Sequence, residues 1–278
     1  MKKQKLRTEI KKTVEQVQEK GAMAASLTNA VTLEFVINTQ IAIGGTPGAL
    51  YQNEAEESFI HSGDAMSINL GSFIPDYIQS IPKTVKKLNK KKQNWVLDPV
   101  GISVGDERKE LFQELKKHQP PIIRGNASEI INVAILWDLK IGTDKALLRG
   151  PDSTNTVEEA EESAVALARV TEGVVVVTGE NDFITDGEKA IYSYGGSKYL
   201  SLITGGGDSL TGIIAIYAAI ANPLIAALTG VSVYNLAGKK AEEKANGPGT
   251  FKPLFIDELF NLEAEAVAQN EFEIKELE

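Results

Sequence analysis

The sequence contains no cysteine and only two histidines, His61 and His118, among its 278 residues. Without cysteine the chain forms no disulfide, no thiolate-based zinc site and no cysteine nucleophile. The histidines are isolated in the sequence, whereas metal sites need clustered ligands, so both are expected at the surface rather than on a metal. A chain without disulfides is compatible with a reducing compartment, and we expect a cytoplasmic protein.

Long apolar runs and excess positive charge are also missing. The longest apolar run, residues 212–221, ends at Asn222-Pro223, whereas a membrane span needs about 20 apolar residues. Residues 1–20 are charged throughout, unlike a secretory signal. The formal charge of -9 argues against non-specific nucleic-acid binding. It leaves anionic nucleotides possible as ligands, because a local cradle outweighs a diffuse field.

Helical and strand patterns alternate along the chain. The spacing of Leu6, Ile10, Val14 and Val17 predicts an amphipathic first helix. Further helices are predicted at residues 54–63, 82–92, 106–118 and 157–171, from residue 126 onward, and in three stretches between the glycine run at 205–207 and residue 261. Strands are predicted at residues 66–70, 95–98, 121–124 and 173–178, with a hairpin formed by 183–185 and 189–194.

This alternation predicts an α/β fold with a mostly parallel central sheet and helices on both faces. No linker-like segment divides residues 1–278, so we expect one domain, with an N-terminal helix in residues 1–20. The mostly apolar residues 30–43 precede a predicted loop at 44–48, and the acidic tail of residues 263–278 is expected to fray. In such sheets, ligands bind at the carboxyl ends of the strands.

The most informative run is Gly205-Gly206-Gly207-Asp208, which leads into an apolar helical stretch. Glycines let backbone N–H groups turn toward one point, and a helix N-terminus adds its positive dipole end. A carboxylate beside such an anion cradle is placed to take a proton while negative charge develops. The run therefore indicates phosphoryl transfer to a hydroxyl. The alternative is a glycine-rich turn in which Asp208 is an ordinary helix N-cap.

Other chemistry-bearing residues follow predicted strands. Asp98, Arg124 and Thr178 stand at three strand ends, and Asn126 precedes Glu129 by three residues. Asp98 and Glu129 suit Mg²⁺, Arg124 suits phosphate oxygens, and Thr178 can donate to one. Each also has a structural alternative: a turn residue, a helix cap, a surface ion pair or a loop residue. There is no Gly-x-x-x-x-Gly-Lys-Ser/Thr sequence.

Several stretches together resemble the hydroxyethylthiazole kinase family within the ribokinase-like kinases. Asn126-Ala127-Ser128-Glu129 resembles the Asn-x-x-Glu motif that governs Mg²⁺ and phosphate placement, and Thr204-Gly205-Gly206-Gly207-Asp208 resembles the anion hole and base. The remaining matches are Thr28-Asn29-Ala30-Val31-Thr32 with Phe35 and Asn38, Asn69-Leu70-Gly71, Asp98-Pro99-Val100-Gly101, Arg124-Gly125, Val177-Thr178-Gly179-Glu180 and Gly247-Pro248-Gly249-Thr250-Phe251. They follow the family order across nearly the whole chain.

The resemblance implies a ribokinase-like three-layer fold and a homotrimer with substrate pockets between subunits. It implies catalysis by Asp208 with the backbone of Gly205 and Gly207, and ATP binding through Arg124, Thr178 and Asn126. Contacts to the thiazole alcohol are implied near Asn29, Ala49 and Gly205, and Mg²⁺ ligands at Asp98 and Glu129. The implied reaction converts ATP and 4-methyl-5-(2-hydroxyethyl)thiazole to ADP and the thiazole phosphate, in thiamine salvage.

The sequence departs from the family pattern around the acceptor pocket. Ala49 stands where the family usually has a methionine, and Ala25 where a histidine is often found. Residues 101–105 replace the family's glycine- and alanine-rich loop. Asp208 stands where many members carry cysteine, and aspartate is the base of the wider superfamily. The competing interpretations are a kinase of another small vitamin alcohol, an ATP-dependent dehydratase of hydrated nicotinamide nucleotide, and a nucleotide- or metabolite-binding relative without turnover.

Overall fold

The computed structural model describes residues 3–50, 64–141 and 155–277. The predicted helix at 54–63, with His61, lies outside the described residues. The described chain folds around a nine-stranded sheet with strand order β2-β1-β3-β4-β5-β6-β7-β8-β9. The strands are β1 (Met23–Leu27), β2 (Thr46–Leu50), β3 (Ala65–Asn69), β4 (Asn94–Asp98), β5 (Ile122–Asn126), β6 (Val174–Thr178), β7 (Asp182–Thr185), β8 (Lys189–Ser193) and β9 (Phe272–Glu276).

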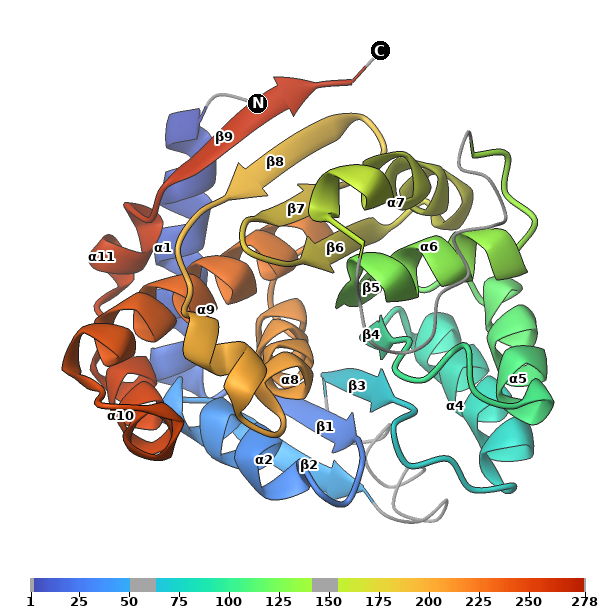
Figure 1. The fold of residues 1–278 in the computed structure, drawn as a ribbon, viewed down its shortest axis with the longest axis horizontal. Coiled ribbons are helices and arrows are strands. Elements are labelled where there is room, and N and C mark those ends of the chain that lie inside the picture. Colours follow the sequence, from blue (N-terminus) through green and yellow to red (C-terminus); the bar gives the residue numbers. More distant parts are fainter. Residues whose placement is uncertain (1–2, 51–63, 142–154, 278) are drawn as a thin grey trace.

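Helices cover both faces of the sheet, which confirms the predicted three-layer α/β architecture (Figure 1). One face carries α1 (Lys3–Lys20), α8 (Gly206–Ala218), α9 (Pro223–Lys244), α10 (Pro248–Asn261) and α11 (Ala264–Ala268). The other face carries α4 (Tyr77–Lys91), α5 (Asp106–Lys116), α6 (Ala127–Leu136) and α7 (Val157–Thr171). Helix α2 (Leu33–Ala42) packs against α8, and the short 3₁₀ helix η2 (Lys198–Leu202) precedes the glycine run.

The two faces of the sheet bury separate hydrophobic cores. In β6, Val174 and Val176 belong to the core under α8 and α9, whereas Val175 and Val177 belong to the core under α6 and α7. This alternation follows from the two-residue period of a strand, and the continuous valine run satisfies both faces. Among the described helices, none is long and apolar enough to cross a membrane.

The parallel part of the sheet places four polar strand ends along one edge. Strands β1 to β6 pair in parallel, and the register aligns Asn69 with Asp98 and Asn126 with Thr178. Each of these four residues is the last of its strand. The carboxyl ends of parallel strands meet at one edge, so the fold gathers Asp98 and Thr178, which were predicted at strand ends, together with Asn69 and Asn126. Arg124 was predicted as the last residue of its strand, but β5 continues to Asn126.

The N-terminal edge of the sheet corrects two expectations. Strand β1 was not expected, and the predicted loop at residues 44–48 is wrong because Thr46–Leu50 form β2, which pairs in parallel with β1. Pro47 and Gly48 are poor strand residues, but an edge strand tolerates them because one side needs no ladder bonds. Helix α4 begins at Tyr77 rather than at residue 82, so Pro82 lies inside the helix instead of in its first turn.

The acidic C-terminal segment also differs from the expected frayed tail. Residues 264–268 form α11, and β9 pairs antiparallel with β8 from Ser193–Phe272 to Lys189–Glu276. Phe272 is fully buried among core residues. The apolar anchor at the start of β9 explains why an otherwise charged strand is held at the sheet edge.

Candidate active site

The glycine run forms the N-terminal turn of α8. Gly205 is the N-cap in the left-handed conformation, with φ 87°, and the helix begins at Gly206 rather than at the apolar residues near 213. A side chain at Gly206 would collide with the carbonyl oxygen of Leu200. Asp208 lies within the first turn and does not cap the helix, so its interpretation as an ordinary N-cap is wrong. First-turn N–H groups lack intrahelical acceptors, so this turn can receive an anion.

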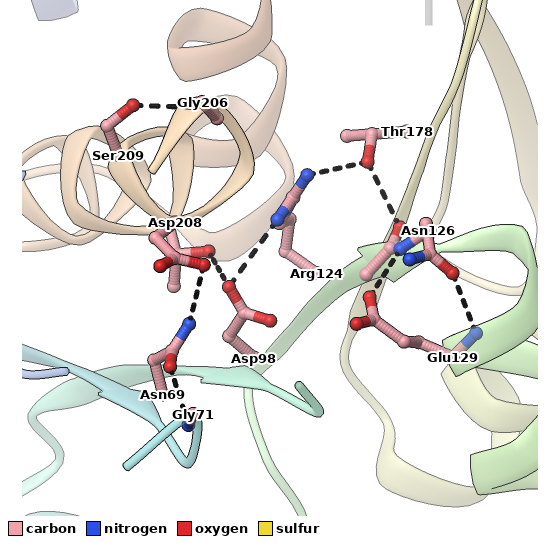
Figure 2. A network of polar contacts seen from close by, with 12 residues as sticks. Asn69, Gly71, Asp98, Arg124, Asn126, Glu129, Thr178, Gly206, Asp208 and Ser209 are labelled. Atoms are coloured by element: carbon pink, nitrogen blue, oxygen red, sulfur yellow. Dashed lines mark hydrogen bonds and ion pairs between the residues drawn. The ribbon is translucent and has the colours of Figure 1, made fainter. Parts of the chain in front are cut away.

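Three side chains donate to the carboxylate of Asp208. Oδ2 accepts from Asn29 Nδ2 at 2.7 Å and from Thr32 Oγ1 at 2.7 Å. Oδ1 accepts from Asn69 Nδ2 at 3.1 Å. The donors come from the loop before α2 and from the end of β3, so Asp208 joins α8 to the sheet edge (Figure 2).

The guanidinium of Arg124 lies between the strand ends and the glycine turn (Figure 2). Nη2 donates to Thr178 Oγ1 at 2.6 Å, and Nη1 lies 3.4 Å from Asp98 Oδ2. A Cβ on Gly207 would lie 3.0 Å from Nη1, so the cation lies directly against the first turn of α8. Arg124 is only 6% exposed, which excludes its interpretation as a surface ion pair. A buried fork of donors beside free helix N–H groups is suited to phosphate oxygens.

Asp98 is fully buried at the end of β4. Its Oδ2 accepts from Thr211 Oγ1 at 2.7 Å and contacts Arg124, whereas its Oδ1 is buried with no hydrogen-bond partner. Burial raises the pKa of this carboxyl to about 6, against the opposing effect of the Arg124 charge. Such burial is unlike a surface turn residue, and the free Oδ1 fits a cation or an ordered water.

Asn126 and Glu129 form a capping box at the start of α6. Asn126 Oδ1 accepts from the Glu129 N–H at 2.9 Å, and Glu129 Oε2 accepts from the Asn126 N–H at 2.8 Å. Burial raises the pKa of Glu129 to about 7, and the negative charge of Asp98 adds to that rise. The structural interpretation of this pair is therefore correct, and the same arrangement holds the Glu129 carboxylate near Arg124 (Figure 2).

A cavity of about 640 Å³ opens beside Arg124 and the glycine turn. That volume is in the range of pockets that hold small cofactors. Its lining comes from the ends of β5 and β6, the loop between β8 and η2, η2 itself, the first turns of α8 and the second half of α9. The lining residues are Arg124, Asn126, Thr178, Gly179, Glu180, Asp182, Gly195, Gly196, Ser197, Lys198, Leu200, Ser201, Gly206, Gly207, Leu210, Tyr234, Asn235 and Glu242.

The structure brings the predicted site residues together with one exception. Arg124, Asn126, Thr178 and Gly207 line the cavity, and the others adjoin them through the contacts above. Ala49 is exposed on the edge strand β2 and takes part in none of the contacts described above. His118 is partly buried, 3.9 Å from Glu114, rather than on the surface.

Sequence reasoning gave no role to four polar residues of the site, although Thr32 and Asn69 stand in stretches that match the family. Thr32, Asn69, Thr211 and Tyr234 all bond to site residues. Asn69 carried a usable signal, because it ends an alternating strand as Asp98 does. Thr211 and Tyr234 lie on α8 and α9, and Thr32 is the N-cap of α2. No local periodicity marks their distant partners.

The donor set fits Mg²⁺ without forming a closed metal cage. Within residues 3–50, 64–141 and 155–277, no group of three or more His, Cys, Asp or Glu side chains could hold an ion alone. Mg²⁺ usually keeps several waters and binds one or two carboxylates together with substrate phosphates. The partnerless Oδ1 of Asp98 supplies one suitable oxygen on this edge of the sheet.

The fold has close structural relatives. Hydroxyethylthiazole kinase from Pyrococcus horikoshii OT3 superimposes with a TM-score of 0.83 at 26% identity, covering 97% of this chain and 99% of that chain. Pyridoxal kinase from Staphylococcus aureus in complex with ADP shares the fold alone, with a TM-score of 0.56 at 12% identity over 78% of this chain and 88% of that chain. The architecture is therefore that of the ribokinase-like kinases.

The sequence comparisons identify one family within the ribokinase-like kinases. The model of the hydroxyethylthiazole kinase family matches residues 14–265. Hydroxyethylthiazole kinase from Bifidobacterium longum (strain DJO10A) is 37% identical over 284 aligned positions, covering 96% of this chain and 90% of the relative. The enzyme of that name from Brachyspira hyodysenteriae is 34% identical, covering 93% and 95%. The chain belongs to the hydroxyethylthiazole kinase family, and it is an enzyme that phosphorylates an alcohol.

Proposed function

We propose that this enzyme transfers the γ-phosphoryl group of ATP to the hydroxyl of 4-methyl-5-(2-hydroxyethyl)thiazole, forming ADP and the thiazole phosphate in thiamine salvage. The observation that carries the proposal is the carboxylate of Asp208 on the first turn of α8, beside the buried guanidinium of Arg124. Family membership supports the same reaction.

Each proposed role follows from a contact in the site. Arg124, Thr178 and Asn126 bind the nucleotide phosphates, because all three line the cavity. The guanidinium of Arg124 is held in place by its contacts with Thr178 and Asp98. The backbone N–H groups near Gly205 and Gly207 hold the oxygens of the transferring group. Asp208 takes the proton of the acceptor hydroxyl. Positioning and charge stabilisation supply most of phosphoryl-transfer catalysis, and this site offers both.

Mg²⁺ is proposed as the cofactor, held by Asp98 and Glu129 directly or through water. The buried Oδ1 of Asp98, which has no hydrogen-bond partner, supports this, because such a carboxylate oxygen is open to a cation. When bound, the ion supplies neutralisation of the phosphate charge.

The acceptor is proposed to bind on the opposite side of Asp208 from the nucleotide, near Asn29, Ala49 and Gly205. Ala49 is exposed on β2, which is compatible with a pocket completed by another subunit. Because Ala49 lacks the methionine side chain usual in the family, Ala49→Met is expected to lower the Kd of the thiazole alcohol, measured by titration calorimetry. An unchanged or higher Kd would remove Ala49 from substrate specificity and favour another vitamin alcohol.

Three features of the whole protein belong to the same proposal. We propose a homotrimer, one kinase domain over residues 1–278, and a cytoplasmic location. Large apolar side chains left exposed on α10 and α2, Phe260 and Ile41, support association of subunits. One sheet running through the described chain supports the single domain.

The test is Mg²⁺-dependent ADP release with the thiazole alcohol and a panel of small vitamin alcohols. Asp208→Asn is expected to abolish transfer while sparing ATP binding. Asp106→Asn is the matched control, because Asp106 also lies in the first turn of a helix but its side chain is 93% exposed. Turnover only on another alcohol would show that the acceptor is that alcohol, and the proposed phosphoryl-transfer mechanism would stand. ATP binding without turnover on any alcohol would contradict the proposed activity.

A further inference from the structure

Asp208 is held by side chains that are distant in sequence. Asn29, Thr32 and Asn69 lie 179, 176 and 139 positions away from it. Thr32 is 4% exposed and Asn69 2% exposed, so neither donor is a surface contact. The tertiary fold therefore builds a specific environment around this one carboxylate.

The two amide donors have fixed orientations. Asn29 Oδ1 accepts from the N–H groups of Val31 at 3.1 Å and Thr32 at 3.0 Å, which turns its Nδ2 toward Asp208. Asn69 Oδ1 likewise accepts from the Gly71 N–H at 2.9 Å, which turns its Nδ2 toward Asp208. Because an asparagine oxygen and nitrogen have opposite hydrogen-bonding character, neither amide can flip without losing these bonds.

Thr32 departs from the usual behaviour of its position. It is the N-cap of α2, where a threonine hydroxyl ordinarily accepts from a first-turn N–H, yet it makes no side-chain cap bond. Its hydroxyl instead donates to Asp208 Oδ2 at 2.7 Å. The contact to Asp208 takes the place of a bond that would have stabilised the helix.

The distribution of donors distinguishes the two carboxylate oxygens. An ionised carboxylate has about four lone-pair sites, two on each oxygen. Oδ2 uses both of its sites for Asn29 and Thr32, whereas Oδ1 uses one for Asn69. One site on Oδ1 remains for a further donor.

We propose that Thr32 and Asn69, with Asn29, are positioning residues that hold the Asp208 carboxylate so that Oδ1 receives the proton of the acceptor. This rests on the proposed function, in which Asp208 is the base. The hydroxyl O–H bond breaks and its proton passes to Oδ1, while the hydroxyl oxygen bonds to the γ-phosphorus. The bond from that phosphorus to the bridging oxygen breaks, and its electron pair leaves on ADP.

A carboxylate needs such restraint, because the terminal torsion of aspartate has a broad, roughly two-fold energy profile. Without the bonds to Oδ2, the group can rotate and exchange its oxygens. Small misplacements of a reacting group are costly to rate, and they leave the binding of ATP at Arg124 unaffected. Loss of a positioning bond therefore lowers kcat with little change in KM.

The experiment compares Thr32→Val, Thr32→Ser and the matched control Thr39→Val. Thr32→Val keeps the shape and removes the hydroxyl, and we expect kcat to fall about tenfold or more with both KM values within about twofold. Thr32→Ser restores the donor and most of the rate. Thr39 is a fully buried threonine within α2, the helix that Thr32 caps, and its hydroxyl donates to Val36 O at 2.8 Å rather than to a site residue, so Thr39→Val leaves kcat nearly unchanged.

Asn69→Ala provides a second variant that acts on the other oxygen, and thermal unfolding checks that each variant is folded. A wild-type kcat in both Thr32→Val and Asn69→Ala would overturn the positioning role. A rise in acceptor KM alone would overturn it too, because Thr32 would then bind the substrate. If Asp208→Asn retains turnover, the base assignment of the proposed function fails. If Asp208→Asn is inactive while Thr32→Val and Asn69→Ala are both fully active, only the positioning proposal fails.

Discussion

Tyr234 links α9 to the glycine turn at the start of α8. Its hydroxyl donates to the carbonyl oxygen of Gly206 and lies 2.8 Å from Ser209 Oγ, which also bonds to that carbonyl at 3.3 Å. The residue is 4% exposed and lines the cavity. We expect Tyr234→Phe to lower kcat/KM for ATP several-fold, because the anion-binding turn loses its brace. The free energy of unfolding should fall by about 1 kcal/mol.

Steady-state kinetics with varied ATP and urea unfolding check this prediction. Tyr217→Phe is the control, because Tyr217 is a buried tyrosine on α8 that lies outside the hydrogen bonds to Gly206 and Ser209. It makes the same chemical change in a similar environment. Equal kinetic effects in the two variants would show that Tyr234 acts through packing rather than through its hydroxyl.

Asp182 couples the cavity wall to pH. It is 6% exposed and accepts from the Gly179 N–H at 3.2 Å and from Asn235 Nδ2 at 2.8 Å. Burial raises the pKa of its carboxyl from 3.8 to about 6. The folded state therefore holds this proton more tightly than the unfolded state, so the stabilisation is complete below pH 3.8 and is lost as pH rises through about 6.

This rise corresponds to about 3 kcal/mol of unfolding free energy. We expect Asp182→Asn to remove it, so that the variant gains stability relative to wild type as pH rises from about 4 to about 7. Urea unfolding across this window measures the difference. A pH-independent effect of the new amide does not change the slope of this stability difference against pH. The other buried carboxyls are present in both proteins, so their titration cancels from the difference. A stability difference that stays constant with pH would contradict the prediction.

Single residues of the site could be predicted only where the sheet topology alone places them. Asp98 and Thr178 end strands and Arg124 lies near the end of another, so the parallel-sheet rule brings them together without knowledge of any contact. The local sequence around Thr32 is typical of a helix cap, whereas the hydrogen-bond partner of its hydroxyl, Asp208, lies 176 residues away. Its orientation depends on packing between α2 and α8, which no local pattern encodes.

At the scale of elements, β9 offers a direct test of the corrected C-terminal fold. Phe272 is fully buried against the core that contains α1, with Lys3 Nζ 5.1 Å and Arg7 Cζ 6.0 Å from its ring centroid. We expect Phe272→Ala to lower the free energy of unfolding by about 3–5 kcal/mol, because it leaves a cavity. The exposed Glu271 gives the control variant Glu271→Ala, with a change within about 0.5 kcal/mol.

Thermal or urea unfolding of both variants decides between a docked strand and a frayed tail. A loss below about 1 kcal/mol for Phe272→Ala would contradict docking, since even modest core truncations cost more. Limited proteolysis gives an independent readout, because undocking exposes the backbone of residues 272–276.

The elements missed from sequence share a physical cause. β2 and β9 are the two edge strands of the sheet and β1 lies beside β2, so all three depend on tertiary pairing rather than on a strong local pattern. β9 carried a weak signal, since Phe272 and Ile274 alternate with charged residues at period two. The net acidity of the tail concealed it. The longer, periodic helix α7 at Val157–Thr171 was predicted to the residue.

At the scale of the whole molecule, the proposed trimer needs a surface that a lone subunit leaves exposed. Phe260 on α10 is 71% exposed and Ile41 on α2 is 55% exposed. Helix α10 packs against α2, and α2 packs against the edge strand β2 (Figure 1). Phe260→Glu replaces the more exposed of these two apolar side chains with a charge. We expect the variant to lose the mass of three 30.0 kDa chains and move toward that of one, with Phe260→Leu retaining the assembly.

Light scattering gives the mass, and kinetics on the same samples link it to function. If the acceptor pocket is completed by a neighbouring subunit near Ala49, dissociation raises the acceptor KM much more than the ATP KM, because the ATP cavity is lined within one chain. A wild-type chain that scatters as a monomer would contradict the trimer outright. If Phe260→Glu dissociates and its acceptor KM is unchanged, the trimer proposal still stands. The whole acceptor pocket would then lie within one subunit, between Asp208 and the ends of β1 and β3.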